Sequence, residues 1–163
     1  MAEQGRHEEG IALMQEGLTT LHAAGPRAQY LCLLVDAYRK TGRINDGLGA
    51  LSEVMSATDE DEERWGGFEP ELHRLKGELL LKKDDSDAAE ARHCFQRAIE
   101  TARNRSAKSW ELRATMSLAR LLAKQDRREE GRAMLVDIYG WFTEGFDTAD
   151  LKDAKALLDE LSR

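Results

Sequence analysis

The segment from Asp87 to Arg105, DAAEARHCFQRAIETARNR, decides the fold. It places Ala91, Phe95 and Ala98 at steps of four and three, so a small residue, a large ring and another small residue share one helix face. The same order of small, large, and small or branched residues recurs, at Gly10, Met14 and Gly17, at Gly47, Leu51 and Val54, and at Gly131, Leu135 and Ile138. The four copies begin 37, 44 and 40 residues apart, which indicates a repeat array.

The composition favours helices. Charged residues make up 34% of the 163 residues, aromatic residues only 6%, and the chain contains two prolines. Helices with solvated outer faces have such a composition, and the length suffices for about four helical hairpins. We therefore expect an all-α protein of antiparallel helical hairpins.

The charge and the cysteines restrict the partners and the compartment. A net charge of -7 argues against general affinity for nucleic acid or anionic membrane, although a local basic strip is compatible with it. Cys32 and Cys94 lie far apart within helical patterns, which favours a reduced intracellular chain. The sequence has no apolar run of membrane-spanning length and begins with polar residues, so we expect a cytoplasmic protein.

The repeat pattern divides the chain into one array over residues 1–163. Its parts are 1–25, the second helix of an incomplete repeat; 26–57, 68–105 and 107–143, three repeats; and 147–162, a capping helix. Gly5 precedes Gly10 by five residues, as Gly42 precedes Gly47, so we expect Gly5 in a turn. Either the chain is a fragment or residues 1–5 are an abbreviated start, and a helix without its partner favours the fragment. Gly25 and Pro26 are expected to end one helix and open the next.

The connecting and terminal segments carry further expectations. The run 58–64 is expected to be a solvated acidic loop, and 65–68 a link with two aromatic anchors. His73 and Lys76 occupy positions that are apolar in other repeats, so either that helix is rotated or their polar ends reach solvent. Asp147 is a candidate N-cap of the last helix. Its apolar stripe is Leu151, Ala154, Leu157, Leu158 and Leu161, and the aromatic residues expected beneath it are Trp141, Phe142 and Phe146.

These positions together resemble tetratricopeptide repeats over nearly the whole chain. That family has apolar and small residues in the first helix of each unit, and small, aromatic and small residues in the second. The matching residues are Leu31, Leu34, Val35, Tyr38, Gly47, Leu51 and Val54; Gly77, Leu80, Ala91, Phe95 and Ala98; and Leu118, Ala119, Leu122, Gly131, Leu135 and Ile138. The resemblance implies hairpins stacked in a right-handed solenoid with a C-terminal capping helix, and a role in binding proteins.

Three phrases also resemble the C-terminal tail of bacterial regulatory proteins. They are ELHRLKGELLL, SWELRATMSLARLL and YGWFTEGFDTADLKDAKALLDEL. In those proteins a class III adenylate or guanylate cyclase domain, or a DNA-binding domain, precedes an AAA-type ATPase module and a long tetratricopeptide tail. The resemblance implies that any cyclase or ATPase activity resides in domains outside this chain.

The sequence contains no motif that carries catalysis. It has no Gly-rich phosphate loop, no His-Glu-x-x-His and no Cys-x-x-Cys. His93 and Cys94 are neighbours, but adjacent helix residues point about 100 degrees apart, so this pair needs outside ligands to hold a metal. We expect no enzyme activity and no cofactor.

The inner face of the array is the candidate site. In the tetratricopeptide register the first helices line a groove, whose expected residues are Arg39, Arg74, Glu78, Lys82, Arg113, Met116, Arg120 and Lys124, with Cys32 and Asp36. Six of these ten are basic, so the groove is a candidate for an acidic peptide. The alternative is that these are ordinary solvated side chains. Two functions follow, a protein-interaction scaffold or a self-association module that uses the uncovered first helix or the 65–68 link.

Overall fold

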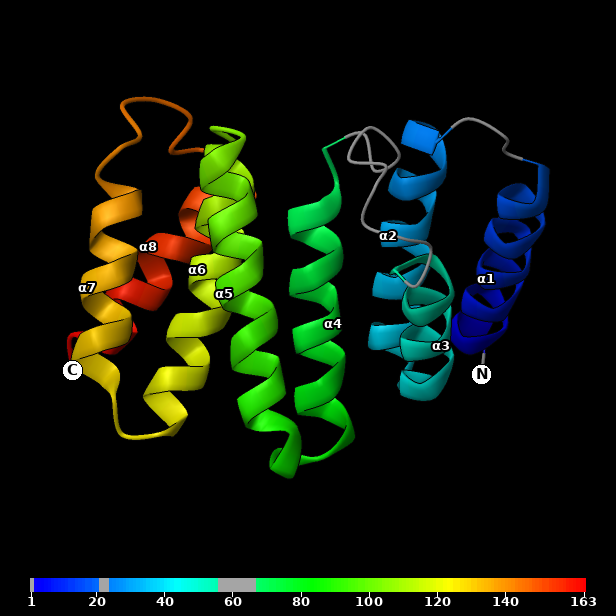
Figure 1. Ribbon diagram of the computed structural model, residues 1–163, viewed down its shortest axis with the longest axis horizontal. Helices are drawn as coiled ribbons and strands as arrows, with labels where there is room; N and C mark the ends of the chain where they lie inside the picture. Colours follow the sequence, from blue (N-terminus) through cyan, green and yellow to red (C-terminus); the bar gives the residue numbers. More distant parts are fainter. Residues whose placement is uncertain (1, 21–23, 56–66) are drawn as a thin grey trace.

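The computed structural model describes residues 2–20, 24–55 and 67–163 (Figure 1). Over these ranges every regular element is helical, which confirms the all-α prediction. The elements are α1 (Ala2–Thr20), α2 (Ala24–Thr41), α3 (Ile44–Met55), α4 (Glu69–Lys83), the short 3-10 helix η2 (Asp85–Asp87), α5 (Ala88–Asn104), α6 (Lys108–Lys124), α7 (Arg128–Tyr139) and α8 (Ala149–Leu161).

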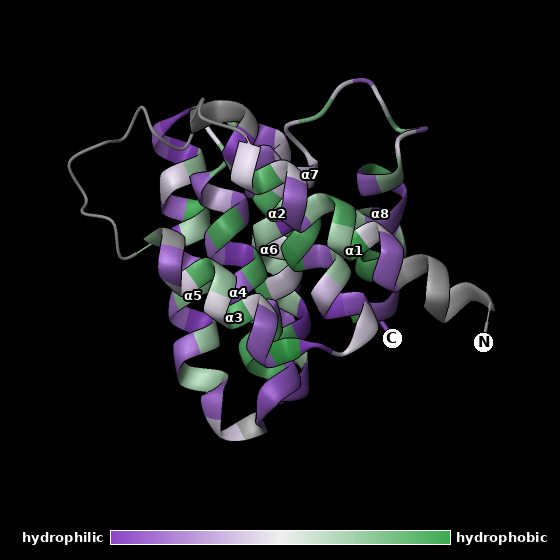
Figure 2. Cartoon of the chain, turned by 90° about the vertical axis from the view of Figure 1, so that its right-hand side faces the viewer, coloured by the Kyte–Doolittle hydropathy of each residue, from purple (hydrophilic) through white to green (hydrophobic). Residues whose placement is uncertain are grey.

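The helices form two layers. Helices that follow one another pack together, as α2 with α3, α4 with α5, and α6 with α7 (Figure 1). Alternate helices also touch, since α4 contacts α2 and α6, and α6 contacts α8. The helices α2, α4, α6 and α8 therefore share one layer, while α3, α5 and α7 cover its other side. Figure 2 shows hydrophobic and hydrophilic residues alternating along these helices, as amphipathic elements require.

The repeated pattern places its large residue over a small one in the core. Ala91, Phe95 and Ala98 of α5 are completely buried. A Cβ atom built on Gly77 of α4 would lie 2.5 Å from Cε1 of Phe95, so the ring occupies the space that a side chain at Gly77 would need. The absence of a side chain at Gly77 thus allows α4 and α5 to pack with the ring between them.

A Cβ built on the other glycines of the pattern would meet different kinds of atoms. A Cβ on Gly131 of α7 would lie 3.0 Å from the Cα and carbonyl oxygen of Ala119 in α6, so the two backbones approach closely there. At Gly47 the tight contact is with a methyl group of Leu79, at 2.9 Å. A Cβ on Gly10 would meet no described atom within 4 Å outside its own helix backbone, so the pattern marks no close approach at this position of α1. The side chain of Val54 lies outside the described part.

Two expectations about the N-terminal half are wrong. Gly5 was expected in a turn, but α1 begins at Ala2 and includes it. Gly25 and Pro26 do not separate two helices, because α1 ends at Thr20 and α2 already begins at Ala24. Pro26 falls in the first turn of α2. The N–H groups of that turn have no acceptor within the helix, so the N–H that proline lacks costs no helical hydrogen bond. The predicted acidic loop 58–64 and Trp65 lie outside the described residues.

The contacts of Phe68 and of the polar residues of α4 can be compared with the prediction. The Phe68 ring lies 5.8 Å from that of Trp110, so this aromatic anchor packs against α6. Lys76 extends its ammonium group to Glu90 on α5, 3.0 Å away, as the snorkelling alternative predicts. His73 is 17% exposed at its side chain, and this burial, together with nearby positive charge, lowers its pKa to about 4.

The last helix buries its predicted stripe against α6 and α7. The buried residues of α8 are Leu151, Ala154, Leu157 and Leu161, and Leu158 is partly buried. Phe142 packs against this cluster, but Trp141 and Phe146 are 58% and 46% exposed, so their predicted place beneath the helix is wrong. Trp141 instead meets the edge of Phe142, and Phe146 meets Tyr139.

The N-cap prediction for α8 is also wrong. Thr148, not Asp147, is the residue before the helix, and its hydroxyl donates to the carbonyl of Gly145 at 2.7 Å. Gly145 has a φ of +77°, a left-handed conformation that glycine adopts without strain. The chain therefore turns at Gly145, and the turn places Thr148 rather than Asp147 at the start of the helix.

Candidate functional site

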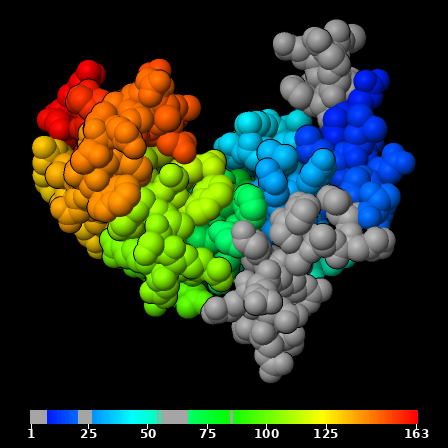
Figure 3. Space-filling view, turned by 90° about the horizontal axis from the view of Figure 1, so that it is seen from above, coloured from blue at the N-terminus to red at the C-terminus, as the bar shows by residue number. Residues whose placement is uncertain are grey.

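A polar cavity of about 440 Å³ opens on the layer formed by α2, α4, α6 and α8. Figure 3 shows the molecule hollowed between its C-terminal part and the α2–α3 region, with the middle of the chain as the floor. The residues that line the cavity are Asp36, Arg39, Lys40, Arg74, Glu78, Arg113, Met116, Ser117, Arg120, Asp150 and Asp153. We call this cavity the groove.

Most of the residues predicted from the tetratricopeptide register do line the groove. They are Arg39, Arg74, Glu78, Arg113, Met116 and Arg120, with Asp36 beside them. Lys82 and Lys124 are exposed but do not line it. The ammonium group of Lys82 instead donates to the carbonyl oxygen of Arg39 at 3.1 Å, at the end of α2. Cys32 is buried in the apolar core beside the groove, and burial raises its pKa to about 12.

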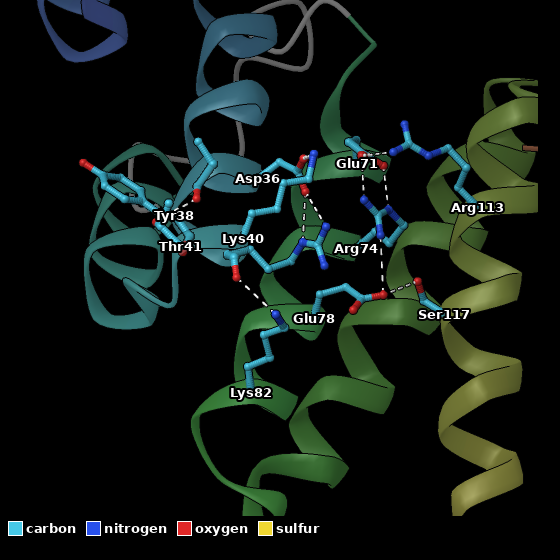
Figure 4. Close-up of polar contacts among 12 residues, drawn as sticks. Asp36, Tyr38, Lys40, Thr41, Glu71, Arg74, Glu78, Lys82, Arg113 and Ser117 are labelled. Carbon is cyan, nitrogen blue, oxygen red and sulfur yellow. Dashed lines mark hydrogen bonds and ion pairs between the residues drawn. The ribbon is translucent and has the colours of Figure 1, made fainter. Parts of the chain in front are cut away.

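Glu71 does not line the groove itself but pairs with two arginines that do, and the sequence interpretation missed it. Its side chain is 5% exposed and accepts two hydrogen bonds from the Nε and Nη2 atoms of Arg74, both at 2.8 Å (Figure 4). Nη2 of Arg113 on α6 lies 3.0 Å from the same carboxylate. Glu71 thus joins α4 to α6. The signal in the sequence was its spacing of three residues from Arg74, which places both on one side of a helix.

A second bridge between α4 and α6 lies one turn further along. Ser117 donates a hydrogen bond to Oε1 of Glu78 at 2.7 Å, and Nη1 of Arg74 lies 3.5 Å from the same oxygen (Figure 4). Burial acts to lower the pKa of Arg74, but its hydrogen bonds to Glu71 and the nearby carboxylates raise it above its usual value. Arg74 is therefore charged and held by the protein itself.

The α2 wall of the groove carries two cations for one carboxylate. Asp36 accepts hydrogen bonds from Nε and Nη2 of Arg39, at 2.9 and 2.7 Å, and Nζ of Lys40 lies 2.7 Å from its other oxygen. Burial acts to raise the pKa of Asp36, but Lys40 and Arg39 hold it below its usual value. This wall therefore keeps one positive charge in excess.

The wall formed by α6 and α8 contains charges that face the open groove. Nε of Arg113 lies 3.8 Å from Asp150, and its guanidinium stacks 5.2 Å above the Trp110 ring. Among the residues the structure describes, the side chains of Arg120 and Asp153 have no hydrogen bond or ion pair. These two side chains are available to a ligand.

The predicted basic strip is therefore wrong in its charge balance. Arg74 and Arg113 are paired with Glu71, and α8 contributes Asp150 and Asp153, which the prediction did not include. The cationic and anionic side chains at the groove are nearly equal in number. The only uncompensated charges at the groove are those of side chains that lack a full counter-charge among the described residues.

Other kinds of site find no support in the described ranges. No group of three or more His, Cys, Asp or Glu side chains there could hold a metal ion. Cys32 and Cys94 are both buried and free, and burial raises the pKa of each thiol. None of the described helices has the length and apolar character needed to cross a membrane.

No protein-family model and no curated protein matches this chain.

Proposed function

We propose that this chain is a protein-interaction module that binds a segment of another protein in the groove. In this proposal the hairpins α2–α3, α4–α5 and α6–α7 are tetratricopeptide-like repeats of a right-handed solenoid, α1 belongs to an incomplete repeat, and α8 is the cap. The contacts of α2 with α4, α4 with α6, and α6 with α8 support it, because each hairpin then stacks on the next.

The observation that carries the proposal is a groove that crosses four helices and holds charged side chains without partners. Arg120 and Asp153 line it, and neither is satisfied by the described parts of the chain. A polypeptide segment can span several helices and supply both backbone groups and side chains to such a groove. Arg74 lines the groove and is already held by Glu71, which reduces the ordering that binding requires.

We place the module in the cytoplasm, as the C-terminal part of a larger signalling protein with an AAA-type ATPase or class III cyclase domain. The resemblance of the GWFTEGFDT phrase and of α6 to such tails supports this context. The module then has no catalytic role, and binding in the groove relays the presence of a partner to the other domains.

The test is a selection of random dodecapeptides displayed on phage against the immobilised chain, followed by affinity measurement. Enriched peptides are labelled, and their Kd is measured by fluorescence anisotropy for the wild type and for Arg120→Glu. We expect at least a tenfold loss with this substitution, about 1.4 kcal/mol. The matched control is Arg97→Glu on α5, a 50% exposed arginine outside the groove, which should leave Kd unchanged. A failure to enrich peptides, or equal losses in both variants, contradicts the proposal.

A second candidate function is self-association, which exposed apolar side chains on α1 and α2 favour. Leu13, Leu33 and Tyr30 are 69%, 53% and 42% exposed. Phe68 of the predicted 65–68 link does not contribute, because it packs against Trp110. Sedimentation or light scattering of the wild type and of Leu33→Lys tests this candidate. A wild-type monomer over a wide concentration range rules it out, while a dimer that Leu33→Lys dissociates supports it.

A further inference from the structure

The groove carries its spare positive charge at one end. Asp36 is shared by Arg39 and Lys40, so one of the two cations remains uncompensated. Arg120 on α6 lines the same cavity without an ion pair to any described side chain. Two positive charges are therefore available between α2 and α6.

The spare negative charge lies elsewhere, on α8. Asp153 is exposed, lines the groove and has no ion pair within the described residues. Asp150 is 44% exposed, and its nearest cation is Nε of Arg113 at 3.8 Å, a distance too long for a good hydrogen bond. Arg113 is at the same time held by Glu71 at 3.0 Å, so it does not fully neutralise Asp150.

The contacts show where Arg39, Arg120 and Asp150 lie along the groove. Ser117 of α6 meets Glu78 of α4, and Lys82, one turn beyond Glu78, meets the end of α2 at Arg39. The C-terminal ends of α2, α4 and α6 therefore lie together, and Arg120 follows Ser117 toward that end. Helix C-termini also favour cations, and in turn a ligand's acidic groups beside those cations.

Asp150 marks the other end, because it faces Arg113 near the start of α6. Arg113 and Arg120 are seven residues apart, which corresponds to about 10 Å along a helix. An extended peptide covers that distance in about three residues. Both ends are thus within reach of one short segment.

We infer that the groove binds a polypeptide segment of mixed charge, with acidic side chains at Arg39, Lys40 and Arg120 and a basic side chain at Asp150 and Asp153. This inference rests on the proposed function and names the ligand more closely. A purely acidic segment would place like charges beside the two aspartates, which is unfavourable. The separation of the two charged ends selects segments in which acidic and basic residues stand about three residues apart.

The experiment reads the charge pattern of the dodecapeptides that the wild-type chain enriches. We expect acidic and basic residues in the same peptides, at a preferred separation of two to four positions. The double variant Asp150→Lys/Asp153→Lys should enrich peptides without the basic residue. For these peptides, we expect the wild type to bind at least tenfold more weakly than the double variant does. Asp159→Lys is the matched control, because Asp159 lies on the same helix, is 57% exposed and does not line the groove.

The outcomes separate this inference from the proposed function. Enrichment of purely acidic peptides by the wild type overturns the inference and leaves a peptide-binding groove, whereas no enrichment of any peptide overturns both. Lysine at Asp150 lies near a helix N-terminus and lowers stability, so Asp150→Asn/Asp153→Asn is made as well. This neutral variant should lose the preference for basic residues while keeping its helical circular dichroism; an unchanged preference in it overturns the inference.

Discussion

Replacement of Gly77 by alanine tests the packing of α4 against α5. The new methyl group would lie 2.5 Å from Cε1 of Phe95 and 2.9 Å from two further ring atoms. Phe95 is completely buried, so its ring has no solvent to move into. Either the ring leaves its preferred position or α4 and α5 separate.

The expected change in the free energy of unfolding for Gly77→Ala is the difference of two effects. Forcing a methyl group into a packed core costs typically 1–3 kcal/mol, and three contacts below 3.0 Å place this site near the upper value, about 3 kcal/mol. Alanine in a helix interior gains about 1 kcal/mol over glycine. We therefore expect Gly77→Ala to lower the free energy of unfolding by about 2 kcal/mol, and Tm by roughly 4–8 °C for a chain of this size.

Gly49→Ala in α3 is the matched control. Gly49 is a helical glycine with nothing within 4 Å of a built Cβ, so alanine should stabilise the protein by up to about 1 kcal/mol. Urea unfolding followed by circular dichroism at 222 nm measures both variants. In the double variant Gly77→Ala/Phe95→Leu the smaller side chain makes room, so its loss should be less than the sum of the single losses. A gain in stability for Gly77→Ala equal to that of Gly49→Ala would refute the reasoning.

Three further predictions concern pH, the Glu71–Arg74 ion pair and the second tight glycine. Burial lowers the pKa of His73 from 6.5 to about 4 in the folded chain, so the unfolded chain takes up the proton at a higher pH than the folded chain does. The free energy of unfolding is therefore highest above pH 6.5 and falls by about 3 kcal/mol as the pH is lowered to 4. His73→Gln should flatten the urea midpoint over that pH range, and an unchanged slope would contradict the assignment. Glu71→Gln leaves the buried Arg74 with only the more distant carboxylate of Glu78, at 3.5 Å, so we expect a loss of about 3 kcal/mol in urea unfolding, and a loss below about 1 kcal/mol would show that the Glu71–Arg74 pair does not stabilise the fold. Gly131→Ala meets the backbone of Ala119 at 3.0 Å and should lower Tm, whereas a raised Tm would mean that α6 and α7 separate freely.

The periodicity of the sequence predicted correctly which residues are buried, but it was a poor guide to where the chain turns. Ala91, Phe95 and Ala98 are completely buried because residues at steps of three and four share the helix face that meets a neighbour. Gly5 was assigned to a turn by analogy with Gly42, which does have a φ of +77°. The analogy failed because glycine permits a turn without requiring one, and Gly5 lies in a continuous helix.

The position of the groove was predicted from the sequence, but the pairing of its charged side chains was not. The resemblance to tetratricopeptide repeats predicted that Arg39, Arg113 and Arg120 share one face, and they do line one cavity. Spacing within a helix does not reveal which carboxylate pairs with an arginine across two helices, as Glu71 does with Arg113. Asp150 reaches the groove only because of how α8 packs on α6, and the stripe that buries α8 does not specify this.

The most direct test of the central claim is a map of the bound peptide on the protein by NMR. Backbone amide shifts of the 15N-labelled chain are recorded during titration with the most enriched dodecapeptide. We predict that the largest changes fall on α2, α4, α6 and α8, with Ser117 and Asp153 among them. Changes confined to α5 and α7, around the separate surface pocket at Gln96 and Met134, would contradict binding in the groove.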